Sequence, residues 1–467
     1  MIKKSIMKFL FKICVVTAVL SFISCSASLE NKSGSVYFSI GSNSSREADF
    51  PLADSGETFS LTVTLDGDYK SSRTTKFTDS ATIVFEEIPL GSKIFARAEI
   101  HLLEGDKKIL KYSGTSEPLV VQEEDNILSI LMKQALTIKF MTSPTGSVFM
   151  EQTIEYGKTA TRPSDPMDQA GNQEFITWCT VDGKTPFDFS SPIKSNTTII
   201  ARWWSQGDFV KVDGATSTGE LLTPYSYIFT EDTEITIGNL YVCNHEVTQA
   251  EYETYCAYPN GSSPNGSDKA NYPVYYVNWY DTLVYCNFRS IDEGLTPCYS
   301  ISGTTNPKEW PGIIGNDATK YYGPASSSNT WNEVSYNENA NGYRLPTEAE
   351  WEYVARGGKE WKSFNISGCE NEENYAQYAQ CSDEDSGAQK IKQHTPNTLS
   401  IYDMSGNVSE WCSTRPEIEY EGEDPVCPTR GGSYADNKNT CYVNSRSPSE
   451  PYVRDEYTGF RIVRNRK

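Results

Sequence analysis

The sequence predicts an α+β chain of several domains in which strands outnumber helices. Its 467 residues exceed one typical hydrophobic core, so two to four domains are expected. Strand-like alternation of apolar and polar residues fills residues 34–135, whereas helix signals fall within residues 206–467. That last part also contains a stretch rich in glycine, asparagine and serine, residues 303–342, which favours irregular chain.

The composition excludes several classes of function. The formal net charge is −21, and residues 1–24 hold four lysines and no acidic residue, so the remainder carries −25. Such a surface repels phosphate backbones and anionic lipid, so no nucleic-acid partner is expected. Only three histidines occur, His101, His245 and His394, which leaves little to build a histidine metal site or a nucleophile triad.

The N-terminus predicts export and lipid anchoring. In residues 1–24, lysines precede an apolar run that is too short for a membrane span, as in a signal peptide. Phe22-Ile23-Ser24-Cys25 resembles a bacterial lipobox, so we expect Cys25 to carry the acyl anchor and residues 25–33 to form a tether. The expected location is the cell envelope, with the chain held to the lipid bilayer and facing the periplasm or the surface. An ordinary signal peptide cut nearby is the alternative.

Two β modules are predicted next, with no visible chemistry. Residues 34–135 read as a small β-sandwich spacer, because five alternating runs are separated by turn clusters. Residues 136–205 resemble the β-grasp surface repeat of the internalin B-repeat type, which implies spacing and not catalysis. The landmarks of this second module are Tyr156-Gly157, Pro163, Pro166, Trp178, Phe187-Asp188-Phe189 and Ala201-Arg202-Trp203.

Three helices are predicted in residues 206–467. Thr248 with Glu251, and Thr347 with Glu350, have the spacing of a capping box, in which each side chain caps the other's backbone. The second of these helices is expected to end at Gly357-Gly358. A further helix is expected over residues 278–290, with Leu283, Val284 and Phe288 facing inward.

The most ordered motif is IYDMSGNVSEWC, residues 401–412. Asn407 and Glu410 lie three residues apart in a glycine-containing turn, so an amide oxygen and a carboxylate can face one small space. A hard, oxygen-preferring cation such as Ca²⁺ needs such ligands. The alternative is a turn packed on Trp411 without an ion.

Together with YRLPTEAEWEYVARGG (343–358), TRGGSY (429–434) and TGFRIVR (458–464), this motif closely resembles the formylglycine-generating enzyme family, also called the sulfatase-modifying factor family. The resemblance covers residues 206–467 and implies a C-type-lectin-like fold. It also implies calcium at Asn407 and Glu410, with main-chain oxygens of Gly406 and Val408, and a weaker calcium site at Asn374.

Enzymes of this family oxidise a sulfatase cysteine to formylglycine, and the resemblance implies copper held by two cysteines. Ser433 matches the family's serine and Cys441 matches the second cysteine, but Asp436 stands at the first. A carboxylate is a hard ligand where Cu(I) prefers soft thiolates, so copper is not expected. Cys441 is then interpreted as a buried small residue or a disulfide partner.

Ten cysteines follow Cys25, and pairing is expected in an exported protein. Their connectivity cannot be deduced from spacing. Cys412 with Cys427, and Cys369 with Cys381, are predicted because each pair closes a loop of low apolar content.

A segment rich in tyrosine, asparagine and serine follows the GGS motif, and this composition suits an adaptable recognition surface. We call residues 434–447 the recognition segment; a plain solvated loop is the alternative. We therefore expect a domain that binds a protein or glycan ligand without copper chemistry. The rivals are an active formylglycine-generating oxidase and an architectural envelope protein. The residues of interest in the segment are Tyr434, Asn437, Asn439, Tyr442, Asn444, Ser445 and Ser447.

Overall fold

The computed structural model divides the described chain into two compact units, which we treat separately. The predicted leader and Cys25 lie outside the described residues. No helix in the described part is long and apolar enough to cross a membrane. The described residues are 33–42, 57–77, 83–124, 126–218, 226, 228–230, 234–259, 264–265, 268–315, 320–381, 387–414 and 425–466.

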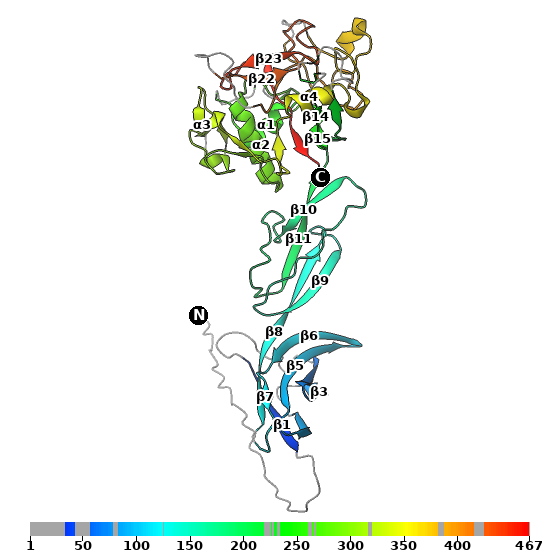
Figure 1. The fold of residues 1–467 in the computed structure, drawn as a ribbon, viewed down its shortest axis with the longest axis vertical. Coiled ribbons are helices and arrows are strands. Elements are labelled where there is room, and N and C mark those ends of the chain that lie inside the picture. The colour runs from blue at the N-terminus through cyan, green and yellow to red at the C-terminus, as the bar shows by residue number, and fades with distance from the viewer. Residues whose placement is uncertain are drawn as a thin grey trace, which may run out of the picture. The chain divides into compact units, whose positions relative to one another are not determined.

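The first unit consists of strands around one hydrophobic core (Figure 1). Its long strand β5 alternates buried and more exposed residues, so one face supplies Ile94, Ala96, Ala98, Ile100 and Leu102 to the core. The strands are β1 (Ser33–Ser42), β2 (Thr58–Gly67), β3 (Ser71–Phe77), β4 (Val84–Pro89), β5 (Lys93–Glu104), β6 (Lys107–Thr115), β7 (Leu119–Val120) and β8 (Ile127–Met141).

The five predicted runs each fall on an observed strand: β1, β2, β4, β5 and β8. The sequence did not reveal β3, because its residues are mostly polar and the strand lies at the end of the sheet path, paired only with β2. Strand β8 continues through residue 135, where a domain boundary was predicted. The sandwich and β-grasp interpretations and the domain boundaries stay predictions.

Residues 139–205 add three further strands, and Trp178 is fully buried with its ring 5.1 Å from that of Phe140. The antiparallel pair β10–β11 extends from Gln173 opposite Ser205 to Cys179 opposite Ile200. The strands are β9 (Val148–Glu155), β10 (Gln173–Cys179) and β11 (Thr197–Ser205).

All four α-helices of the described residues lie in the C-terminal part, amid short strands and irregular chain (Figure 1). The three predicted helix starts are confirmed, because Thr248, Asn278 and Thr347 each cap a helix reciprocally with the residue three positions on. The helices are α1 (Gln249–Tyr255), α2 (Trp279–Glu293), α3 (Asn329–Asn332) and α4 (Glu348–Ala355), with 3₁₀ turns η4 (Pro307–Glu309), η5 (Gly358–Glu360) and η6 (Glu372–Gln377).

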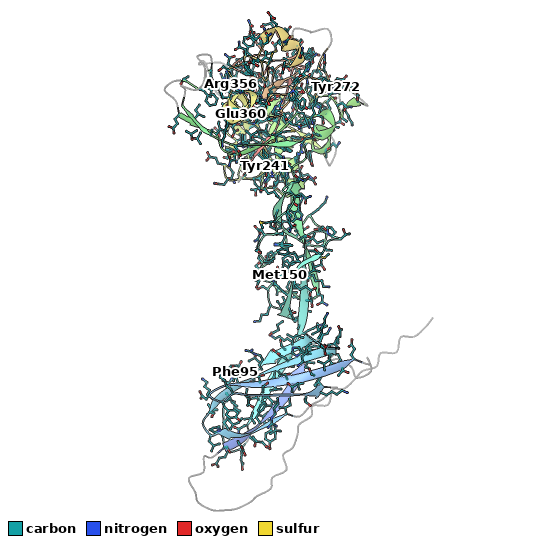
Figure 2. The ribbon with its side chains drawn as sticks, turned by 90° about the vertical axis from the view of Figure 1, so that its right-hand side faces the viewer. Phe95, Met150, Tyr241, Tyr272, Arg356 and Glu360 are labelled. Carbon is teal, nitrogen blue, oxygen red and sulfur yellow. The ribbon has the colours of Figure 1, made fainter. Side chains whose placement is uncertain are left out.

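Two four-stranded sheets organise this part. The first has the order β12-β15-β25-β20, with Tyr241 of β15 labelled in Figure 2, and the second has the order β23-β22-β21-β24. Their strands are β12 (Phe209–Val212), β15 (Leu240–Cys243), β20 (Tyr343–Arg344), β21 (Ser409–Trp411), β22 (Cys427–Arg430), β23 (Arg446–Ser449), β24 (Thr458–Gly459) and β25 (Val463–Asn465). Three two-residue or three-residue pairs complete the set: β13 (Thr216–Thr218) with β14 (Glu234–Thr236), β16 (Tyr299–Ser300) with β19 (Ser335–Tyr336), and β17 (Ile314–Gly315) with β18 (Tyr321–Tyr322).

Candidate ligand-binding site

The three C-terminal motifs meet in the second sheet. Strand β21 pairs antiparallel with β22 and parallel with β24, so Glu410 lies between Arg430 on one side and Gly459 on the other. The residues of GNVSEW, TRGGSY and TGFRIV are thereby brought together although they lie up to about fifty positions apart. The side-chain contacts around this sheet define the candidate site.

Glu410 is fully committed to protein donors. The Arg461 guanidinium donates three hydrogen bonds of 2.6–2.9 Å to the carboxylate, and the indole N–H of Trp351 donates a fourth at 2.7 Å. Glu410 and Arg461 are each 1 % exposed. The charge and the lone pairs of Glu410 are thus used within the protein, and its role as a calcium ligand stays a prediction.

Asn407 is likewise engaged. Its side-chain amide donates to Glu246 Oε2 at 2.7 Å, and its amide oxygen accepts the backbone N–H of Gln389 at 2.9 Å. Gly406 allows this tight turn, because a Cβ there would lie 1.9 Å from the carbonyl oxygen of Gln380. Both side chains of the predicted ligand pair therefore hold the turn together.

Burial makes Glu246 electrostatically unusual. Its pKa is raised well above the ordinary value by burial and by the neighbouring Asp403 and Glu410 carboxylates, while Arg461 opposes the shift.

Among the described residues, no group of three or more acidic, histidine or cysteine side chains is arranged to hold a metal ion. Asn374 lies exposed in η6, and its role in a second calcium site stays a prediction.

The loop after the GGS motif is closed by Asp436. Its Oδ2 accepts the backbone N–H of Ser433 at 2.8 Å and the Ser433 hydroxyl at 2.7 Å. Gly432 brings the backbone close to Cys441, since a Cβ at Gly432 would lie 2.9 Å from the Cys441 sulfur. The family positions Ser433, Asp436 and Cys441 thus lie in one loop, with the Asp436 carboxylate hydrogen-bonded to Ser433.

A second thiol lies against Cys441 that spacing did not reveal. The Cys381 and Cys441 side chains lie against each other, and both belong to a small buried cluster with Cys369. Cys381 comes from the chain just after η6, sixty residues before Cys441. A buried Cys381 in the YAQC stretch was a weak signal, because only the fold shows which thiol it meets.

The structure bonds neither predicted disulfide pair, and all ten cysteines of the described residues are buried thiols. Cys412 and Cys427 belong to different hydrophobic clusters. Cys369 donates its thiol proton to the carbonyl oxygen of Asn371 at 3.1 Å. The length of the loop between two cysteines does not determine whether their side chains point toward each other.

The recognition segment is anchored at several points and exposed between them. Asn437 and Asn439 are exposed, whereas Tyr434 is buried and donates its backbone N–H to Asn407 at 2.8 Å. Lys438 and the Tyr442 hydroxyl both contact the Glu372 carboxylate, at 2.7 and 3.2 Å. The segment is therefore an ordered surface, with Tyr442, Asn444, Ser445 and Ser447 half-buried.

Tyrosines from three chain segments gather beside Tyr434, and we call Tyr275, Tyr276, Tyr434 and Tyr457 the tyrosine face. The Tyr434 and Tyr457 ring centroids are 5.6 Å apart, those of Tyr275 and Tyr276 are 5.4 Å apart, and the Tyr276 hydroxyl donates to Glu456 at 3.1 Å. Burial, then the Glu456 charge and the other tyrosines, raise the pKa of Tyr434 to about 12, so the face stays neutral at physiological pH.

Tyr276 is held in a strained backbone conformation. Its φ is 58°, a value that bulky side chains rarely adopt, and its backbone N–H is fixed by the Asp455 carbonyl at 2.7 Å. Such strain is common where a side chain is positioned for function. The run of tyrosines in residues 272–280 was the signal that sequence reasoning passed over.

A cavity of about 390 Å³ lies elsewhere in the same unit, beside Arg289, Glu293 and Tyr343, and none of the predicted site residues lines it. The candidate site is accordingly a surface and not this cavity.

Comparison with protein families decides the membership. Residues 207–466 match the model of the sulfatase-modifying factor enzyme 1-like domain. The chain belongs to this family. A chaperone protein LppX from Paenibacillus barcinonensis is 33% identical over 254 residues, which are 50% of this chain and 83% of that protein.

One further curated protein and one solved structure are similar to this chain. A formylglycine-generating enzyme from Streptomyces coelicolor is 30% identical over 163 residues, 29% of this chain and 50% of that protein, so this chain spans about half its length. The solved structure of Treponema denticola variable protein 1 is 28% identical and covers 55% of this chain and 95% of its own, with a TM-score of 0.45.

The copper implied by the sulfatase-modifying factor family does not fit the family positions of this chain. Asp436 supplies oxygen where a thiolate is needed, and that oxygen is already bonded to Ser433. The family positions therefore offer one thiolate, that of Cys441, where Cu(I) prefers two. We derive no oxidation step from these residues.

Proposed function

We propose that the sulfatase-modifying factor domain of this chain binds a ligand at the tyrosine face and the adjoining recognition segment, without formylglycine-generating activity. The observation that carries the proposal is the convergence, beside Glu456, of buried Tyr434 with half-buried tyrosines from two other chain segments. Tyrosine supplies a large amphipathic contact area with few rotatable bonds, as recognition surfaces require.

A protein ligand is favoured over a glycan. The relative from Paenibacillus barcinonensis is described as a chaperone protein and matches over most of its own length. Exposed Asn437 and Asn439, in the segment that begins with Tyr434, add polar groups to the aromatic ones, a mixture typical of protein interfaces. An architectural role and an active oxidase are the competing functions.

Alanine variants of the tyrosine face test the proposal. The purified chain would be screened on peptide and glycan arrays, and its affinity for the strongest binder measured. We expect Tyr276→Ala and Tyr457→Ala each to weaken binding by about 30-fold, because a buried interface aromatic contributes about 2 kcal/mol or more. The matched control is Tyr336→Ala, an exposed tyrosine on β19 outside the face, which should bind normally.

The same preparation tests the oxidase rival. The chain would be incubated with Cu(I), oxygen and a CxPxR-type peptide, and the peptide cysteine examined by mass spectrometry for conversion to an aldehyde. Turnover would overturn the proposed function, as would array binding that the tyrosine variants leave unchanged.

Calcium at the Asn407 turn stays a prediction and has a direct test. We expect EDTA to lower the melting temperature of the C-terminal part and added Ca²⁺ to restore it, since an ion bound only by the folded chain stabilises it. Because Arg461 neutralises Glu410, the informative variant is Asn407→Ala, which should abolish the calcium response. An unchanged melting curve with EDTA would remove calcium from the proposal.

We also propose that Cys25 anchors the chain to the envelope membrane by an acyl group. The expected result is partitioning of the protein into the detergent phase, which Cys25→Ala abolishes. Retention of the variant in that phase would indicate a different anchor.

A further inference from the structure

The buried cluster beneath the recognition segment is unusually rich in thiols. Three of its five fully buried members are cysteines, Cys369, Cys381 and Cys441, at 1, 7 and 0 % exposure. The half-buried rings of Tyr375, Tyr378 and Tyr442 pack around them. The cysteine sulfur atoms of this cluster therefore lie where the chain after η6 meets the recognition segment.

Two of the three thiols are close neighbours. Cys381 and Cys441 lie against each other in the cluster, whereas Cys369 donates its thiol proton to the carbonyl oxygen of Asn371. The Cys441 sulfur also lies 3.5 Å from the carbonyl oxygen of Ser433, so its position is fixed from two sides. Two thiols in contact need little backbone movement to form a bond.

We propose that Cys381 and Cys441 are a thiol–disulfide exchange site that closes into a disulfide, with low-molecular-weight disulfides as its oxidants. This inference is independent of ligand binding at the tyrosine face. The bond would fasten the recognition segment covalently to the chain that follows η6.

Solvent exposure sets the order of the steps. Cys381 is 7 % exposed and lies in the chain just after η6, whereas Cys441 is fully buried. A reagent that arrives from solvent therefore meets the Cys381 sulfur first, and Cys441 acts as the second thiol.

Disulfide formation takes two exchange steps. In the first step, the Cys381 thiolate attacks one sulfur of the small disulfide, whose S–S bond breaks and releases one small thiol. The Cys441 sulfur, after losing its proton to solvent, attacks the Cys381 sulfur of the mixed disulfide and releases the second small thiol. The protein loses two electrons and two protons, and the reagent becomes two thiols.

The unmodified chain supplies the decisive experiment. Purified protein would be reduced, exposed to oxidised glutathione, alkylated under denaturing conditions and digested without reductant. We expect mass spectrometry to find a peptide that contains Cys381 linked to one that contains Cys441, with Cys369 alkylated. A Cys369–Cys381 link, or alkylation of all three cysteines, would overturn the proposal.

Variants add a second readout. Oxidation should raise the melting temperature of the C-terminal part by at least about 5 °C, because the bond closes a loop of about sixty residues. Cys369→Ser should keep this shift, whereas Cys381→Ser and Cys441→Ser should lose it. A third outcome would also overturn the proposal. If Cu(I) blocks alkylation of both thiols, whereas oxidised glutathione leaves both thiols open to alkylation, the pair is a metal site and not a disulfide site.

Discussion

Replacing Arg461 with methionine is expected to lower the free energy of unfolding of the C-terminal part by about 3–5 kcal/mol. The guanidinium neutralises Glu410 and also donates to the carbonyl oxygens of Cys243 and Tyr402. Without it, the Glu410 carboxylate would be buried beside Glu246 with no counter-charge. Urea denaturation followed by tryptophan fluorescence measures the change.

A compensating variant separates the charge from the packing. Adding Glu410→Gln to Arg461→Met removes the stranded charge and keeps an oxygen for the Trp351 indole, so part of the stability should return. The surface control is Lys390→Met, whose partner Asp268 lies 2.8 Å away in a half-exposed pair beside Tyr272, labelled in Figure 2. This control should melt like the unmodified chain. Equal losses for Arg461→Met and Lys390→Met would contradict the buried-pair argument.

Asp436→Cys is expected to raise the Cu(I) affinity of the reduced chain by more than about 100-fold, since losing even supporting contacts around a metal costs 10–100-fold. The change returns a soft ligand to the loop that carries Cys441. Competition with a chromophoric Cu(I) chelator under anaerobic conditions measures the affinity.

Asp436→Ser is the matched control for this gain. It removes the carboxylate that holds Ser433 but adds no sulfur, so its Cu(I) affinity should stay near that of the unmodified chain. Absence of any gain in Asp436→Cys would count against placing Asp436 at the first cysteine of the family.

Local chemistry made the helix starts predictable. Thr248 with Glu251 and Thr347 with Glu350 form complete capping boxes, because the bonded groups are only three residues apart. The sequence thus contains both partners of the interaction within one turn. The residues of GNVSEW were also singled out correctly as the centre of a tightly ordered region.

The chemistry of that region was not predictable from spacing. The hydrogen-bonding partner of Glu410, Arg461, lies fifty-one residues further on and is selected by sheet order. The contact between Cys381 and Cys441 has the same origin. A pattern of residue types shows which side chains are able to interact, but the fold decides which of them meet.

Strand β25 lies between β15 and β20, pairing Val463 with Val242 and with Arg344 (Figure 1). The first sheet of this domain therefore pairs strands that lie more than two hundred residues apart in the sequence. Such non-local pairing cannot form progressively from one end of the chain. A chain still emerging from a ribosome or a secretion channel would expose the apolar faces of β15 until residues 463–465 arrive. Folding of this domain is expected to be slow and to finish late, so a chaperone that binds the unfolded chain would be useful until β25 pairs with β15 and β20.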